Sequence, residues 1–244
     1  MDRLIDLPLG GRLRLAEPMA DARGTVLICP GGAYEWLSPR EAEPVAAALQ
    51  NGGWNTALFT YTVHTPGGEP LGTLPLCQLG EAVARLRQER DGLVVVCGFS
   101  AGGHLAASLG VHWRTLDLPR PDALVLGYPV ITAGRFAHRG SIQNLAGGEN
   151  EGFFSLETQA GPQVPPVFLW HTVTDPEVPV QNSLLFAQAL IEAGVSCELH
   201  LYPYGVHGLS LATPEVEEPA KDRFADAHIA GWFDNCLSWL TTLS

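Results

Sequence analysis

One stretch of the chain reads Leu93-Val94-Val95-Val96-Cys97-Gly98-Phe99-Ser100-Ala101-Gly102, and its composition changes midway. Residues 93–97 are apolar and mostly β-branched, as in a buried strand, whereas residues 104–109 have the composition of a helix. Glycines two positions on either side of Ser100 leave room for a sharp strand-to-helix turn that exposes the serine. This pattern predicts a nucleophile elbow rather than an ordinary glycine-rich turn.

Short apolar runs alternate with longer helical segments on both sides of this turn, which is typical of a mostly parallel sheet with helices on both faces. Strands are expected at residues 25–29, 55–60, 93–97, 123–127, 167–171 and 196–202. Helices are expected at residues 39–50, 76–89, 101–111, 180–193 and 221–240. Residues 4–7 and 12–15, separated by two glycines, suggest a hairpin at the sheet edge. The fold class is therefore α/β.

The 244 residues suit a single α/β domain with a sizeable core, and no repeat or linker divides the sequence. Residues 131–166 are rich in glycine and proline and show no clear helical or strand period. Long segments of this kind are commonly functional lids or mobile loops. We expect this insertion to cover the active site, with a surface decoration as the alternative.

The net charge of −12 would repel phosphate backbones and anionic membrane surfaces, so neither nucleic acid nor a membrane is an expected partner. Residues 1–6 lack a cationic segment followed by an apolar core, which favours a cytoplasmic protein, although a trimmed leader would leave the same appearance. With 46% hydrophobic and only 16% charged residues, the composition weakly suggests a homo-oligomer interface.

The five cysteines predict buried, reduced thiols and no metal site. Cys29, Cys97 and Cys197 fall within expected strands, where a thiol packs as a small hydrophobe. No Cys-x-x-Cys or His-Glu-x-x-His spacing occurs, so zinc has poor support. His171 and Asp175 are close enough in sequence to share a metal ion, but a catalytic role explains Asp175 better.

A nucleophilic serine needs a base to take its proton and a carboxylate to orient that base. Both should follow later strands, because reactive groups gather at the carboxyl ends of parallel strands. Asp175 follows the expected strand 167–171 and is our acid, with a turn role or nearby Glu177 as alternatives. His207 follows the strand 196–202 and is our base. His200 within that strand and His228 in the last helix fit structural roles better.

The order Ser100, Asp175, His207 is that of α/β-hydrolases and differs from the orders of chymotrypsin and subtilisin. An oxyanion hole is expected from Cys29-Pro30-Gly31-Gly32-Ala33-Tyr34, which leaves the strand 25–29 at the same end. The donors we expect are the backbone amides of Gly32 and Ala33, joined by that of Ala101 after the nucleophile. An ordinary Gly-Gly turn is the alternative for residues 31–32.

These motifs resemble the α/β-hydrolase esterases related to bacterial acetyl esterases, acetylxylan esterases and hormone-sensitive-lipase-like enzymes. The resemblance rests on residues 30–34, 98–104, 166–172 with Asp175, 178–180 and 202–208. Such relatives commonly carry His-Gly-Gly-Gly where this chain has Pro30-Gly31-Gly32-Ala33, and the proline variant is closer to the sugar-acetyl esterase branch. The resemblance implies a serine carboxylesterase that removes acetyl groups from small esters such as acetylated sugars or xylo-oligosaccharides, with no metal or organic cofactor.

Aromatic residues near strand ends are candidates for a substrate pocket, with core packing as the alternative. They are Tyr34, Trp36, Tyr61 and Trp170. His104 lies one helical turn after Ser100 and is expected to pack beneath the elbow. Two other functions stay open: a serine peptidase or amidase on the same fold, and a non-catalytic binding protein that inherited it.

Overall fold

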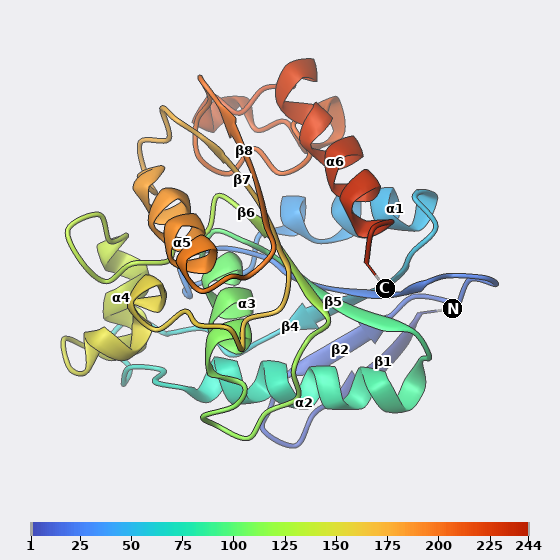
Figure 1. Cartoon of the computed structure of the whole chain (residues 1–244), viewed down its shortest axis with the longest axis horizontal. Coiled ribbons are helices and arrows are strands. Elements are labelled where there is room, and N and C mark those ends of the chain that lie inside the picture. The colour runs from blue at the N-terminus through green and yellow to red at the C-terminus, as the bar shows by residue number, and fades with distance from the viewer. Residues whose placement is uncertain (1, 244) are drawn as a thin grey trace.

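An eight-stranded sheet runs through the protein, seen edge-on in the computed structural model of Figure 1, which describes residues 2–243. Its spatial order is β1-β2-β4-β3-β5-β6-β7-β8. The strands β3 to β8 are parallel, and β2 pairs antiparallel with both β1 and β4. Their bounds are β1 Arg3–Asp6, β2 Arg12–Leu15, β3 Gly24–Cys29, β4 Asn55–Thr60, β5 Leu93–Phe99, β6 Ala123–Gly127, β7 Val167–Thr172 and β8 Cys197–Tyr202.

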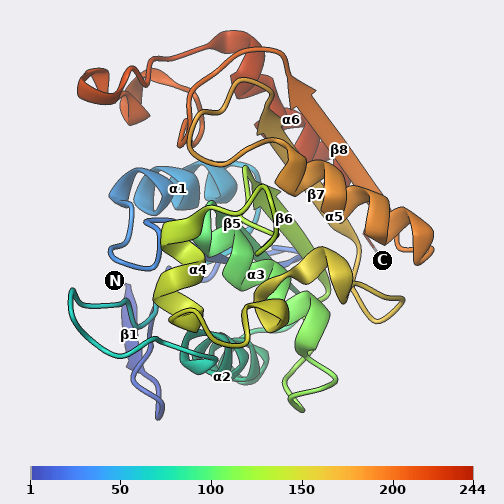
Figure 2. The ribbon, with the colours of Figure 1, turned by 90° about the vertical axis from the view of Figure 1, so that its left-hand side faces the viewer.

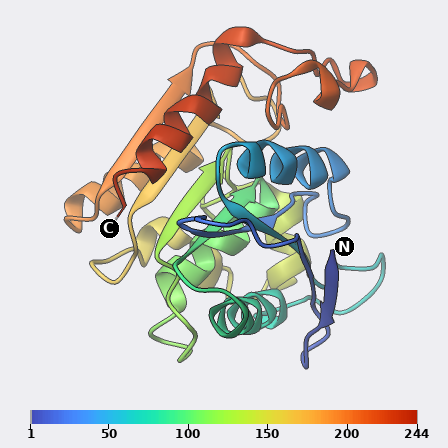
Figure 3. The same cartoon turned by 90° about the vertical axis from the view of Figure 1, so that its right-hand side faces the viewer.

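Helices cover both faces of the sheet. They are α1 Glu43–Asn51, α2 Leu74–Glu89, α3 Ala101–His112, α4 Arg139–Ala146, α5 Gln181–Glu192 and α6 Ala227–Leu240. Helices α1 and α6 lie on one face, and α2, α3 and α5 lie on the other (Figures 1 and 3). The prediction of an α/β fold with a mostly parallel sheet between two helical layers is confirmed.

Successive side chains along the strands pack alternately into two hydrophobic cores, one on each face of the sheet. In β3, Leu27 and Cys29 face the core beneath α2, α3 and α5, whereas Val26 and Ile28 face the core beneath α1 and α6. Because both faces are covered, every residue of β3 and β6 is buried. All five cysteines are free, as expected for reduced thiols.

Two expectations from the sequence differ from the structure. The last helix begins at Ala227 rather than near residue 221, because the Asp226 carboxylate caps it by accepting from the amides of His228 and Ile229. Residues 131–166 are more ordered than expected, since they contain α4 and 3-10 turns at Glu151–Phe154 and Leu156–Thr158. Figure 2 shows α4 beside α3 in front of the sheet.

Candidate active site

Ser100 occupies a strained turn between β5 and α3. Its φ of 52° lies in the left-handed region, and its amide donates to the carbonyl of Gly127 in β6. The flanking glycines are required by close packing: a Cβ on Gly98 would overlap the carbonyl of Gly102, and one on Gly102 would overlap the carbonyl of Cys29. This tight junction presents the hydroxyl at the carboxyl edge of the sheet.

Three side chains from three loops lie in hydrogen-bonding sequence beside this turn. The Ser100 Oγ is 2.8 Å from His207 Nε2, and His207 Nδ1 is 2.6 Å from Asp175 Oδ2. Because a carboxylate only accepts, the Nδ1 of His207 carries a proton and donates it to Asp175. The neutral imidazole therefore leaves Nε2 free to accept from the serine hydroxyl.

Asp175 is buried and held from several directions. Its Oδ1 accepts 2.9 Å hydrogen bonds from the amides of Glu177 and Val178. Burial raises the pKa of Asp175, but hydrogen bonds from His171, His207 and the Val178 amide outweigh it, so the pKa lies well below its ordinary value. Asp175 is consequently ionised at neutral pH.

His171 in β7 is a second histidine beside this carboxylate. Its Nε2 lies 3.0 Å from the Val178 carbonyl and 3.3 Å from Asp175 Oδ2, so it faces two acceptors and carries the proton. Its Nδ1 accepts from the Ser183 hydroxyl at 2.8 Å. His171 thus fixes the Asp175 carboxylate. Across residues 2–243 no cluster of three His, Cys, Asp or Glu side chains is arranged to hold a metal.

The loop after β3 lies beside the serine, since a Cβ added at Gly31 would come within 2.9 Å of the Ser100 Cβ. Gly32, Ala33 and Tyr34 all have positive φ, of 135°, 56° and 63°. The Gly31 carbonyl accepts from the Ser38 amide, and the Gly32 carbonyl accepts from the amides that follow at residues 35 and 36, so both peptide planes are fixed. Within the described chain the amides of Gly32 and Ala33 donate to no protein group, which leaves them available to a substrate oxygen.

A buried carboxylate connects this loop to His207. Glu41 accepts from the Gly31 amide at 2.8 Å and from the Tyr128 hydroxyl at 2.7 Å. The Tyr128 hydroxyl in turn accepts from the Ser210 amide, and its ring packs edge-on against His207 with centroids 5.0 Å apart. Glu41 therefore joins residues 30–34, called the oxyanion loop after their expected role, to the end of β6 and to the loop that carries His207.

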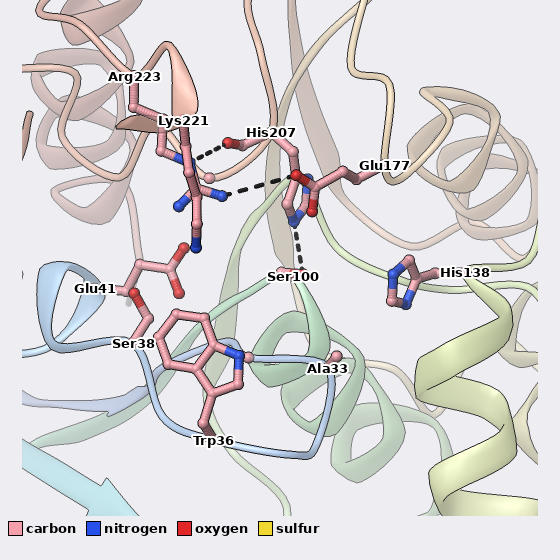
Figure 4. A pocket seen from close by; sticks show the side chains of 12 residues that line it. Ala33, Trp36, Ser38, Glu41, Ser100, His138, Glu177, His207, Lys221 and Arg223 are labelled. Carbon is pink, nitrogen blue, oxygen red and sulfur yellow. Dashed lines mark hydrogen bonds and ion pairs between the residues drawn. The ribbon is translucent and has the colours of Figure 1, made fainter. Parts of the chain in front are cut away.

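These groups open onto a cavity of about 160 Å³, shown in Figure 4. Its lining is mainly polar: Gly32, Ala33, Trp36, Ser38, Glu41, Ser100, His138, Glu177, His207, Gly208, Lys221 and Arg223. Trp36 is 44% exposed at the mouth, with the Lys221 ammonium 5.3 Å from its ring centroid. The Arg223 Nε donates to the His207 carbonyl at 2.7 Å and steadies the histidine loop.

Of the four aromatic candidates, only Trp36 lines this cavity. Tyr34, Tyr61 and Trp170 are core residues instead, which corrects the pocket assignment. The Tyr61 hydroxyl donates to the Pro30 carbonyl, and Trp170 stacks on Trp232 of α6 with centroids 4.9 Å apart. They support the loop and the sheet from behind, so they do not contact a ligand in the cavity.

His104 packs beneath the elbow, as expected. Its Nε2 donates to the Phe154 carbonyl at 3.0 Å, so its Nδ1 accepts from the Tyr34 hydroxyl at 2.9 Å. Burial lowers the pKa of His104 to about 4, against the opposing effect of the hydrogen bond to Phe154. A neutral histidine thereby joins α3 to the oxyanion loop and to the segment 131–166.

Sequence reasoning missed Glu41, His138 and Arg223. A glutamate within a run that begins at Ser38-Pro39-Arg40 looks like part of an exposed first helical turn, and nothing in the local pattern shows that it is buried. His138 lies in the segment without a clear period. It caps α4 by accepting from the Ser141 amide, but histidine is not among the residue types preferred at that position, so the sequence carried no signal for it.

Comparisons with known proteins agree with this architecture. The model of the prolyl oligopeptidase family matches residues 122–238. A protein named endo-1,4-beta-xylanase B from Butyrivibrio fibrisolvens is 38% identical over 212 residues, which are 79% of this chain and 33% of that protein. An acetylxylan esterase from Xylanibacter ruminicola is 30% identical over 203 residues, which are 75% of this chain and 40% of that protein. The chain thus spans well under half the length of these two relatives.

A solved structure extends the similarity over both chains. It is an acetyl ester-xyloside bifunctional hydrolase from Caldicellulosiruptor lactoaceticus, with a TM-score of 0.82 and 33% identity. The alignment covers 96% of this chain and 89% of that one. None of the helices in the described part of the chain is both long and apolar enough to span a membrane. With its sheet order, its helical layers and this near-complete alignment, the chain belongs to the α/β-hydrolase superfamily.

Proposed function

We propose that this protein is a serine carboxylesterase that hydrolyses short-chain, chiefly acetyl, esters of sugars through an acyl-enzyme. The observation that carries the proposal is the unbroken series of hydrogen bonds from Ser100 through His207 to Asp175, beside two amides that donate to no other group. Each part of that arrangement has a defined task in acyl transfer.

In the first half-reaction, Ser100 Oγ attacks the ester carbonyl carbon while its proton moves to His207 Nε2. The carbonyl π electrons move onto the oxygen, which accepts hydrogen bonds from the amides of Gly32, Ala33 and Ala101. The anionic Asp175 stabilises the imidazolium that forms. As the tetrahedral intermediate collapses, the C–O bond to the alcohol breaks and His207 gives its proton to the leaving oxygen.

In the second half-reaction, water replaces the alcohol. His207 takes a proton from the water as its oxygen attacks the acyl carbon, and the same three amides receive the second oxyanion. Collapse breaks the bond to Ser100 Oγ, which regains its proton from His207. The products are the carboxylic acid and the free enzyme, with neither a metal nor a cofactor required for any step.

Size and polarity of the cavity support a short acyl group. A space of about 160 Å³ is smaller than the roughly 300–1,000 Å³ typical of sites for larger organic ligands. Its wall includes the buried polar residues Ser38, Glu41 and Arg223, so it offers little apolar surface to a long alkyl chain. The acetylxylan esterase among the relatives supports an acetylated sugar as the ester.

Replacing Ser100 by alanine tests the proposal. We expect Ser100→Ala to abolish hydrolysis of p-nitrophenyl acetate while circular dichroism shows an unchanged fold. A fluorophosphonate probe should label the native protein and not the variant. Activity retained by the variant, or labelling at another residue, would refute the serine mechanism.

A peptidase or amidase is the second candidate, favoured by the match to the prolyl oligopeptidase family over residues 122–238. A panel of esters with increasing acyl length, acetylated xylo-oligosaccharides and aminoacyl amides separates the two. We expect the highest kcat/KM for acetyl esters. A clear preference for the amides would assign the site to peptide chemistry instead.

The segment 131–166 is proposed to cover one side of the site, which the presence of His138 in the cavity wall supports. A cytoplasmic location, the absence of nucleic-acid and membrane partners, and a homo-oligomer stay predictions from composition. Sedimentation of the purified protein tests the last of these directly.

A further inference from the structure

We propose that the Nε2–H of His138 donates a hydrogen bond to an oxygen in the sugar part of the ester, which makes His138 a substrate-binding residue. The inference rests on the proposed function, because it assigns a partner for the alcohol side of the same reaction. His138 immediately precedes α4 and lines the cavity with Ser100. In Figure 4 its ring extends toward the serine from the side opposite Lys221 and Arg223.

The protonation of the ring is fixed by its other nitrogen. His138 Nδ1 accepts from the amide of Ser141 at 3.2 Å and lies 2.9 Å from the Ser141 hydroxyl. A backbone amide only donates, so Nδ1 must be the unprotonated nitrogen. The neutral ring therefore carries its hydrogen on Nε2 and presents it as a donor.

That donor has no partner within the protein. No hydrogen bond to His138 Nε2 occurs among residues 2–243, whereas Nδ1 is used twice. Partial burial and the neighbouring His207 lower the pKa of His138, while Glu177, Asp175 and Glu35 oppose them. At neutral pH the residue is thus an uncharged donor beside the reacting serine, which suits a neutral oxygen acceptor.

The chemistry of an acetyl ester decides which part of the substrate supplies that acceptor. The acetyl group has one polar atom besides the ester oxygen, namely its carbonyl oxygen, and the amides of Gly32, Ala33 and Ala101 take that atom in the proposed mechanism. The ester oxygen receives its proton from His207 in the same mechanism, so the acceptor for an additional donor is another oxygen of the alcohol. A pyranose offers hydroxyl and ring oxygens close to the ester, whereas a hydrocarbon alcohol offers none.

Two substitutions distinguish the capping role of His138 Nδ1 from the donor role of its Nε2. In His138→Asn the side-chain oxygen takes the place of Nδ1 and keeps the helix cap, but nothing reaches the position of Nε2. In His138→Gln the amide nitrogen reaches the position of Nε2, but the cap is lost. The test compares kcat/KM for a mono-O-acetylated methyl xyloside with that for cyclohexyl acetate, which has a similar ring and no other oxygen, by measuring acetate release.

We expect His138→Asn to lower the ratio of kcat/KM for the xyloside over cyclohexyl acetate by about three- to tenfold, the effect of one neutral hydrogen bond, with an unchanged Tm. We expect His138→Gln to keep that ratio and to lower the Tm. His228→Asn, which changes a histidine outside the cavity, should alter neither ratio nor Tm.

The inference is overturned if His138→Asn leaves the ratio of the two kcat/KM values unchanged. It is also overturned if the ratio falls only in the variant whose Tm falls, because the effect would then come from the lost helix cap. A wild-type enzyme that hydrolyses cyclohexyl acetate but not the xyloside also overturns it. Failure of the proposed function looks different: the wild-type protein would then hydrolyse no ester, or Ser100→Ala would retain the activity.

Discussion

Replacing Glu41 by alanine measures how firmly the oxyanion loop is held. The buried carboxylate accepts from the Gly31 amide at 2.8 Å and from the Tyr128 hydroxyl at 2.7 Å. A hydrogen bond to a charged group contributes about 1.5–3 kcal/mol, so the loss of two is expected to lower the free energy of unfolding by about 3–6 kcal/mol. Since the loop and the His207 side of the site are both released, kcat for p-nitrophenyl acetate should fall more than KM rises.

Glu41→Gln should be much milder. Glutamine keeps one acceptor oxygen for the Gly31 amide, and only the Tyr128 hydroxyl loses its acceptor, while the oxygen of that hydroxyl keeps the hydrogen bond from the Ser210 amide. We expect a loss of only about 1 kcal/mol, the value of one exchanged neutral hydrogen bond. The difference between the native residue and glutamine therefore reports the hydrogen bond at unchanged side-chain volume, and the further loss in alanine includes the effect of that volume.

Urea unfolding followed by tryptophan fluorescence, together with steady-state kinetics, gives both quantities. The matched control is Glu43→Ala, whose largely exposed carboxylate pairs with Arg14 on the surface and should contribute less than about 1 kcal/mol. An alanine variant at position 41 that unfolds within about 1 kcal/mol of the native protein, with unchanged kcat, would refute the coupling of loop and base.

Two further changes address the acid and the buried histidine. Asp175→Asn should lower kcat by a factor on the order of 10³–10⁴ in a folded protein, because an amide no longer holds the protonated tautomer of His207; steady-state kinetics showing less than a tenfold loss would argue against its role. His104 has its pKa lowered to about 4 by burial, so between pH 6.5 and 4 the unfolded chain binds a proton that the native protein does not. The stability it contributes is present above pH 6.5 and falls by about 3 kcal/mol on acidification to pH 4. The free energy of unfolding, measured with denaturant across this pH range, should change more steeply with pH for the native protein than for His104→Gln. Equal slopes would contradict the lowered pKa of His104.

The fold was largely predictable because the strands are buried on both faces and read as unbroken apolar runs. The strands expected at residues 55–60 and 123–127 have those bounds in the structure, and β5 runs two residues beyond the expected 97 to reach the elbow. The helix boundaries were less certain where a side chain decides them, as Asp226 does for α6. Capping depends on one hydrogen bond and leaves little trace in periodicity.

The meeting of Ser100, Asp175 and His207 also followed from sequence order, since each comes directly after a strand and parallel strands end at one edge. The structure shows these side chains in contact, and their catalytic roles are the proposal that the Ser100→Ala experiment tests. Sequence reasoning could place the three on a common edge but could not supply their distances or the charge state of the acid.

Chain order and residue chemistry by themselves determined the α/β class, the strand succession and the side chains that share the sheet edge. Only tertiary packing decided that Trp36 lines the cavity while Trp170, also near a strand end, is sealed against Trp232. Packing likewise decided that Glu41 is buried beneath the oxyanion loop and that His138 presents a free donor. The physical reason is that burial and hydrogen-bond partners depend on segments distant in sequence, whose approach no local pattern encodes.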